Sequence, residues 1–110
     1  MKNDQERLLD IQEAIERIEK YSIRGKKEFE KDELLQIWII HHLQIIGEAA
    51  TRISEEFRKT YSEIPWSQII GMRNILVHDY FGIDTEIVWR AVESDLLALK
   101  QNITKMIKNQ

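Results

Sequence analysis

The chain has 110 residues, 43% hydrophobic and 32% charged, a balance typical of a soluble globular protein, and we expect one domain over residues 1–110. It contains no cysteine, which excludes disulfides and thiolate metal ligands and fits the reducing cytoplasm, where we expect the protein. Its net charge of −3 argues against broad nucleic-acid binding, which depends on summed lysine and arginine contacts, so any RNA contact must be local.

The apolar residues recur at spacings of three and four, which predicts an all-α protein, and we expect a four-helix up-and-down bundle. The longest apolar run, residues 37–40, is too short to span a membrane, and the first seven residues lack the apolar core of an export signal. The first helix is predicted over Asp4–Ser22. Gly25 ends it, and residues 26–28 form a solvated connection. Its core stripe consists of Leu8, Ile11, Ile15 and Ile18.

The second helix is predicted from about Glu30 to Lys59, which makes it the longest. A glycine inside a helix costs about 1 kcal/mol relative to alanine. Gly47 in this helix and Gly71 in the next therefore predict that another helix approaches closely at each glycine, or that two subunits meet there. The core stripe of the second helix consists of Leu35, Ile39, His42, Ile46, Ala49 and Ile53, widened by Ile37, Trp38 and Ile45.

A short turn at residues 60–64 precedes a third helix, which we expect to begin at about Pro65, where a fixed φ and a missing N–H are tolerated. This helix is predicted to continue through Tyr80, with Gly82 as the stop. The fourth helix follows, with Asp84 as its N-cap. Its core stripe consists of Trp89, Val92, Leu96, Leu99, Ile103 and Met106, and the tryptophans Trp38, Trp66 and Trp89 are all interpreted as core residues.

The segment Gly71–Tyr80 is the one place where chemistry explains the residues better than packing does. Arg73 carries a permanent charge on a planar fork that matches a phosphate, and His78 can exchange a proton near neutral pH. Asn74, four residues before His78, adds an amide, and Tyr80 adds a hydroxyl and a stacking surface. No serine or cysteine nucleophile stands beside the histidine, so the set suits phosphodiester chemistry better than acyl transfer.

Three further candidate residues lie in the predicted second helix. We reject a metal site at His41 and His42, because adjacent helical residues point about 100° apart and no carboxylate follows either of them at three or four residues. We therefore expect neither a metal nor a cofactor. Glu48 has apolar neighbours, and two interpretations remain open: an acid at an interface, or a carboxylate that holds Arg73 in a polar pocket.

The pattern Arg73-x4-His78-x-Tyr80, with Asn74 directly after the arginine, resembles the signature of HEPN domains. The wider sequence resembles the HepT branch of these domains, formerly called DUF86, over most of the chain. The strings that carry this likeness are Ile64–Trp66, Ile70–Asn74, Leu76–His78 and Tyr80–Asp84, together with a second block at Leu43–Ala50.

The resemblance implies a homodimer that acts as a metal-independent endoribonuclease toxin of a type VII toxin–antitoxin pair. Its substrate would be RNA, with tRNA as one candidate, and its products a 2′,3′-cyclic phosphate and a 5′-hydroxyl. Arg73 and His78 would be catalytic, with Asn74, Tyr80 and Glu48 in support. An MntA-like nucleotidyltransferase antitoxin would neutralise the toxin by AMPylation of Tyr80, in a hetero-oligomer. The alternative is a non-catalytic HEPN module that binds a nucleotide or a partner protein.

Overall fold

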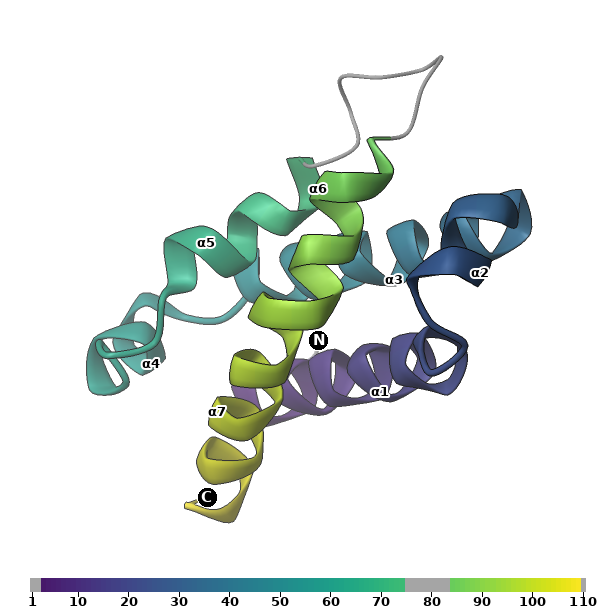
Figure 1. The fold of residues 1–110 in the computed structure, drawn as a ribbon. Helices are drawn as coiled ribbons and strands as arrows, with labels where there is room; N and C mark the ends of the chain where they lie inside the picture. The colour runs from purple at the N-terminus through teal and green to yellow at the C-terminus, as the bar shows by residue number, and fades with distance from the viewer. Residues whose placement is uncertain (1–2, 75–83, 110) are drawn as a thin grey trace.

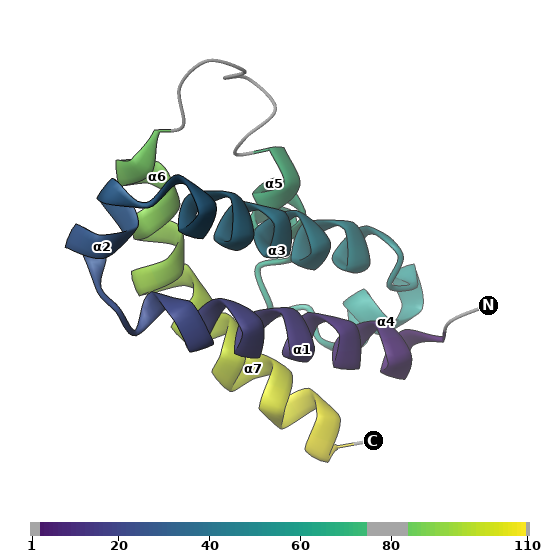
Figure 2. The same ribbon diagram turned by 90° about the vertical axis from the view of Figure 1, so that its right-hand side faces the viewer.

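The computed structural model describes residues 3–74 and 84–109, and all regular structure in these two ranges is helical, which confirms the predicted all-α class. α1 (Asp4–Ser22) and α3 (Glu33–Thr51) are the longest helices and lie side by side, and α7 (Leu96–Lys108) packs across α1 (Figures 1 and 2). Between and beside them lie α2 (Lys26–Lys31), α4 (Glu55–Thr60), α5 (Trp66–Gly71), the 3₁₀ turn η1 (Met72–Asn74), α6 (Thr85–Arg90) and the π-helical segment η2 (Ala91–Asp95).

The first helix has the predicted bounds, but the predicted connection after it is wrong. Gly25, with a φ of 92° that glycine adopts without steric cost, turns the chain directly into α2. Residues 26–28 are therefore helical. Phe29 anchors α2 by complete burial, and the ammonium of Lys26 lies 2.9 Å from the carboxylate of Glu86 on α6. This hydrogen-bonded pairing raises the pKa of Lys26 above its ordinary value.

The predicted second helix over residues 30–59 is wrong, because the chain is helical there in three pieces. The side chain of Asp32 accepts a hydrogen bond from the backbone of α3 and so caps its first turn. Ser54 caps α4 in the same way, and the carboxylate of Asp4 on α1 binds both the backbone N–H and the hydroxyl of Ser54 at 2.8 and 2.6 Å. Arg58 donates to the carbonyls of Thr51 and Ile53 at the end of α3. Caps and these tertiary hydrogen bonds override the continuous apolar spacing.

The last helical run begins where the sequence predicts. Asp84 is the N-cap of α6, and its carboxylate accepts the backbone N–H groups of Glu86 and Ile87 at 3.1 and 3.3 Å. The run continues from α6 through η2 into α7. No helix in the described ranges combines the length and the apolar character needed to cross a membrane.

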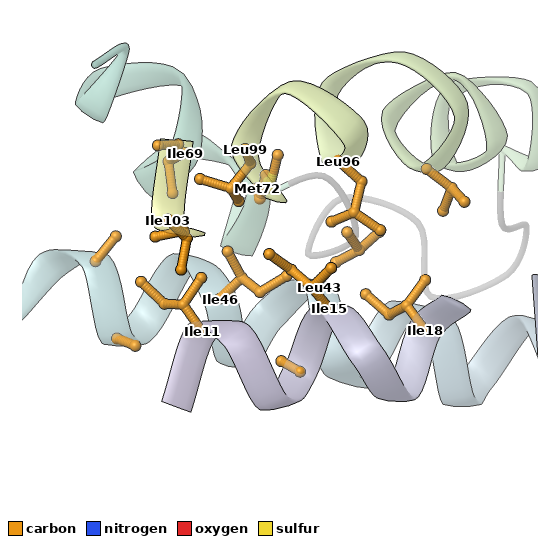
Figure 3. Packing of buried hydrophobic residues seen from close by; sticks show 14 of the residues in the cluster. Ile11, Ile15, Ile18, Leu43, Ile46, Ile69, Met72, Leu96, Leu99 and Ile103 are labelled. Atoms are coloured by element: carbon orange, nitrogen blue, oxygen red, sulfur yellow. The ribbon is translucent and has the colours of Figure 1, made fainter. Parts of the chain in front are cut away.

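The apolar stripes of α1, α3 and α7 meet in one core (Figure 3). Each fully buried aliphatic side chain contributes about 1.5–3 kcal/mol of hydrophobic stabilisation, so this cluster supplies most of the driving force for folding. Trp66 is buried, and Trp38 and Trp89 are half-buried against the cluster, in agreement with their interpretation as core residues. The fully buried members include Leu8, Ile11, Ile15, Ile18, Phe29, Ile39, Leu43, Ile46, Ile53, Ile69, Ile103 and Met106.

Candidate functional site

The segment that carries Arg73 is a short α-helix followed by a 3₁₀ turn. Pro65 is the N-cap of α5, so the helix begins one residue later than predicted. α5 ends at Gly71, and Arg73 lies in the tighter turn η1. The prediction of one α-helix continuing through Arg73 is therefore wrong, since i→i+3 hydrogen bonds replace the α pattern at this helix end. A 3₁₀ turn has fewer residues per turn than an α-helix, so the direction of the Arg73 side chain cannot be taken from α-helical spacing.

Gly47 allows this turn to rest directly on α3. A Cβ atom at Gly47 would lie 2.6 Å from the backbone nitrogen of Arg73 and 2.8 Å from its Cβ. Both distances are shorter than atoms tolerate, so only glycine fits here, and the predicted close approach is confirmed. The same prediction for Gly71 is not met by the described residues: a Cβ there would have no atom within 4 Å.

The carboxylate of Glu48 on α3 forms ion pairs with two arginines. An oxygen of Glu48 lies 3.4 Å from Nη1 of Arg73, and its other oxygen lies 3.4 Å from Nη2 of Arg52. The side chains of Glu48 and Arg73 are 53% and 44% exposed, so water screens the pair and it contributes little to stability. The contact instead orients the guanidinium of Arg73, and it uses only one of the two terminal nitrogens of that group. Of the two interpretations of Glu48, the contact agrees with the one that places it against Arg73.

The other predicted site residues lie at or beyond the edge of the described ranges. Asn74 is the last residue of η1, and its side chain lies outside the described part of the structure. His78 and Tyr80 lie outside the described residues. The structure therefore brings together Arg73 and Glu48, and the roles of Asn74, His78 and Tyr80 remain predictions.

The two histidines of α3 have different environments. His41 is exposed, whereas His42 is only 3% exposed, as its place in the core stripe predicts. Nδ1 of His42 lies 2.7 Å from the carbonyl oxygen of Trp38, and the two rings lie 4.4 Å apart. Burial lowers the pKa of His42 below its ordinary value of 6.5, and the hydrogen bond to the carbonyl offsets part of this effect. His42 is therefore a neutral histidine at physiological pH.

A pocket next to Glu48 contains polar residues to which the sequence analysis gave no site role. Arg7, Asp10, Glu13 and Arg17 of α1 line it together with His42 and Glu48 of α3. The four α1 residues follow helical spacing and so share one face, which is the signal that marks them in the sequence. They were missed because such a charged stripe looks the same whether it faces solvent or borders a hollow.

The chain is similar to a family of proteins with ribonuclease names. The family model described as "Ribonuclease HepT-like" matches residues 11–106. The chain is 39% identical to a "Probable ribonuclease HepT" of Thermococcus cleftensis, over 92% of this chain and 93% of that protein. It is 32% identical to a "Putative RNase" of Caldanaerobacter subterraneus, over 94% of this chain and 89% of that one. A "Putative RNase" of Methanocaldococcus jannaschii is 38% identical over 69% and 70% of the two chains.

No solved structure matches the chain. The family model covers well over half of the residues, and the relatives from Thermococcus and Caldanaerobacter are matched over nearly their whole lengths. The chain therefore belongs to the HepT-like ribonuclease family.

Proposed function

We propose that the protein is a metal-independent endoribonuclease that cuts RNA at a site built on Arg73 and His78. The observation that carries this proposal is the position of Arg73. Its backbone rests on Gly47 and its guanidinium is oriented by Glu48, in a chain whose relatives bear ribonuclease names. A guanidinium that is oriented but still accessible is suited to bind the phosphate of an RNA backbone.

The chemistry proceeds by attack of the neighbouring ribose 2′-oxygen on phosphorus. His78 takes the proton from the 2′-hydroxyl or gives a proton to the leaving 5′-oxygen, and Arg73 stabilises the negative charge that grows on the phosphoryl oxygens. The bond from phosphorus to the 5′-oxygen breaks as the bond to the 2′-oxygen forms. The products are a 2′,3′-cyclic phosphate and a 5′-hydroxyl, and Asn74 and the aromatic ring of Tyr80 support the bound RNA.

The active form in this proposal is a homodimer of four-helix up-and-down HEPN domains. The segments that carry Arg73 meet across the twofold axis, so that two copies of Arg73 and His78 surround one cleft. This arrangement concentrates positive charge at one place in a chain whose net charge is −3. It therefore reconciles local RNA binding with an acidic protein.

Regulation in this proposal acts through Tyr80. The protein is the toxin of a type VII toxin–antitoxin pair, and an MntA-like nucleotidyltransferase antitoxin transfers AMP from ATP to the Tyr80 hydroxyl, with release of pyrophosphate. The added phosphate places bulk and negative charge in the site and competes with RNA for Arg73. Mass spectrometry of the co-expressed pair is expected to find AMP on Tyr80, and Tyr80→Phe is expected to stay toxic in the presence of the antitoxin.

The nuclease proposal is tested by incubating the purified protein with RNA, tRNA first, in the presence of EDTA. We expect cleavage that leaves cyclic phosphate ends and that Arg73→Ala and His78→Ala each abolish. Arg52→Ala is the matched control, because Arg52 contacts the same carboxylate at the same 3.4 Å distance but lies outside the proposed site. Full activity of either site variant removes that residue from the mechanism.

The rival function is a HEPN module that binds a nucleotide or a partner protein without catalysis. Its support is the acidic balance of the chain, with a pI near 5.6, which disfavours broad contact with RNA. Expression in growing cells separates the two functions. Growth arrest that disappears in His78→Ala supports the nuclease, whereas nucleotide binding without toxicity or cleavage supports the module.

A further inference from the structure

The pocket between α1 and α3 is built like a ligand site. It has a volume of about 310 Å³, within the range of small-molecule pockets, and it is lined by residues of α1 and α3, the two helices that lie side by side in Figure 2. Ala14, Ile45 and Ala49 provide its apolar part. An apolar surface beside polar groups is suited to bind a heterocycle.

One polar group of this pocket lacks a partner that a ligand can supply, and the hydrogen bond of a second fixes its tautomer. Nε of Arg7 is buried and has no hydrogen-bond partner among the described residues. Such a donor is costly to leave unpaired, so a ligand with an acceptor is favoured. The Nδ1–H of His42 donates to the Trp38 carbonyl, because a carbonyl can only accept. Nε2 therefore remains as an acceptor on a neutral ring.

The charges of the pocket determine which part of a nucleotide it suits. Two arginines and three carboxylates line it, so with His42 neutral its formal charge is −1. One arginine, Arg17, is already paired with Glu13 at 2.7 Å. A phosphate is disfavoured in such a place, whereas a neutral base that presents several N–H donors is favoured.

The pocket also shares one residue with the proposed nuclease site. Glu48 lines the pocket, and the same carboxylate lies 3.4 Å from Arg73. A base bound between α1 and α3 would therefore belong to a nucleotide beside the phosphate that Arg73 binds.

We propose that the α1–α3 pocket binds a guanine base of the RNA substrate and so selects where the chain is cut. This inference rests on the proposed nuclease function. The adjacent N1–H and N2 amine of guanine match the carboxylate of Glu13, where they would replace the exposed contact with Arg17, and its O6 and N7 acceptors match Arg7. Single-stranded RNA is generally recognised in this way, by stacking and by contacts to the base edges.

The first test measures binding without cleavage. Guanosine and adenosine 5′-monophosphates are titrated into the full chain by calorimetry, with NMR shifts of Ile45 and His42 to locate the ligand. We expect guanosine monophosphate to bind more tightly, and Glu13→Gln and Arg7→Gln each to weaken it roughly tenfold. Glu16→Gln is the matched control, an exposed acid of α1 outside the pocket, and should leave binding unchanged.

The second test compares cleavage of oligonucleotides that differ only in one guanine or adenine. Glu13→Gln should reduce the preference for guanine while the enzyme still cuts. Equal binding of the two nucleotides overturns the pocket assignment even if RNA is cleaved. Specific guanosine monophosphate binding without any cleavage supports the pocket and refutes the nuclease. If Arg7→Gln and Glu13→Gln change only dimerisation, measured by sedimentation, a second subunit fills the pocket and the inference is wrong.

Discussion

The two sides of α3 show how differently packing and chemistry depend on their residues. One side, with Ile39, Leu43 and Ile46, is fully buried in the core that α3 shares with α1. The other side meets the turn that carries Arg73. Gly47 has no side chain, so the turn approaches closely there, and Glu48 forms an exposed ion pair with Arg73. Hydrophobic burial is non-directional, so the first side tolerates changes of shape better than changes of volume. On the second side, one added carbon at Gly47 or one changed group at Glu48 alters the contact with Arg73.

The largest effect on stability is expected from a substitution on the side of α3 that is buried in the core. Ile46→Ala removes a fully buried side chain and should lower the free energy of unfolding by about 2–5 kcal/mol, measured by urea denaturation. Ile37→Ala on the same helix is the control, because Ile37 is 50% exposed and should change stability by less than about 1 kcal/mol. Equal losses in the two variants would contradict the assignment of the core side.

Gly47→Ala tests the side of α3 that meets the Arg73 turn. The added Cβ overlaps the backbone of Arg73, so we expect a loss of about 1–3 kcal/mol, more than the roughly 1 kcal/mol that alanine contributes to helix stability. RNA cleavage should fall with it because Arg73 is displaced. Gly71→Ala is the control, since its Cβ meets nothing within 4 Å among the described residues, and it should be neutral or stabilising. A stable, active Gly47→Ala would show that the turn does not need this contact.

The buried histidine makes stability depend on pH. The pKa of His42 is below 6.5 in the folded protein because of burial, so between that value and 6.5 the unfolded chain binds more protons. Stability should therefore fall as the pH drops below about 6.5, and this dependence should be weaker in His42→Gln. Arg17, His41 and Glu13 also act on this ring. Urea unfolding at a series of pH values measures the slope, and an unchanged slope in the variant would assign it to other groups.

The smallest effect on stability is expected from the ion pair. Glu48→Gln should change the free energy of unfolding by less than about 1 kcal/mol, because both side chains are roughly half exposed. Its effect on RNA cleavage should be larger, since Arg73 loses the group that orients it. A rise in KM with little change in melting temperature is the expected signature. Loss of stability without a change in kinetics would make Glu48 a structural residue only.

Local patterns predicted some elements well and others poorly. The bounds of α1 and the Asp84 cap were predictable, because an apolar stripe and a capping carboxylate are both local signals. The breaks around α3 also carry capping residues, Asp32 and Ser54, but the continuous apolar spacing masked them. Around Ser54 the deciding contact comes from Asp4, fifty residues away. No local pattern contains that contact.

The sequence alone determined the helical class, the core stripes apart from the half-exposed Ile37, and the residues whose chemistry points to phosphate, because periodicity and side-chain type are properties of the chain itself. Only the tertiary structure decided that Gly47 receives the Arg73 turn while a Cβ at Gly71 would contact none of the described residues, and that charged residues of α1 border a pocket beside Glu48. These features depend on how separate helices approach each other. A glycine or an arginine looks the same in the sequence whether its neighbour in space is water or another helix.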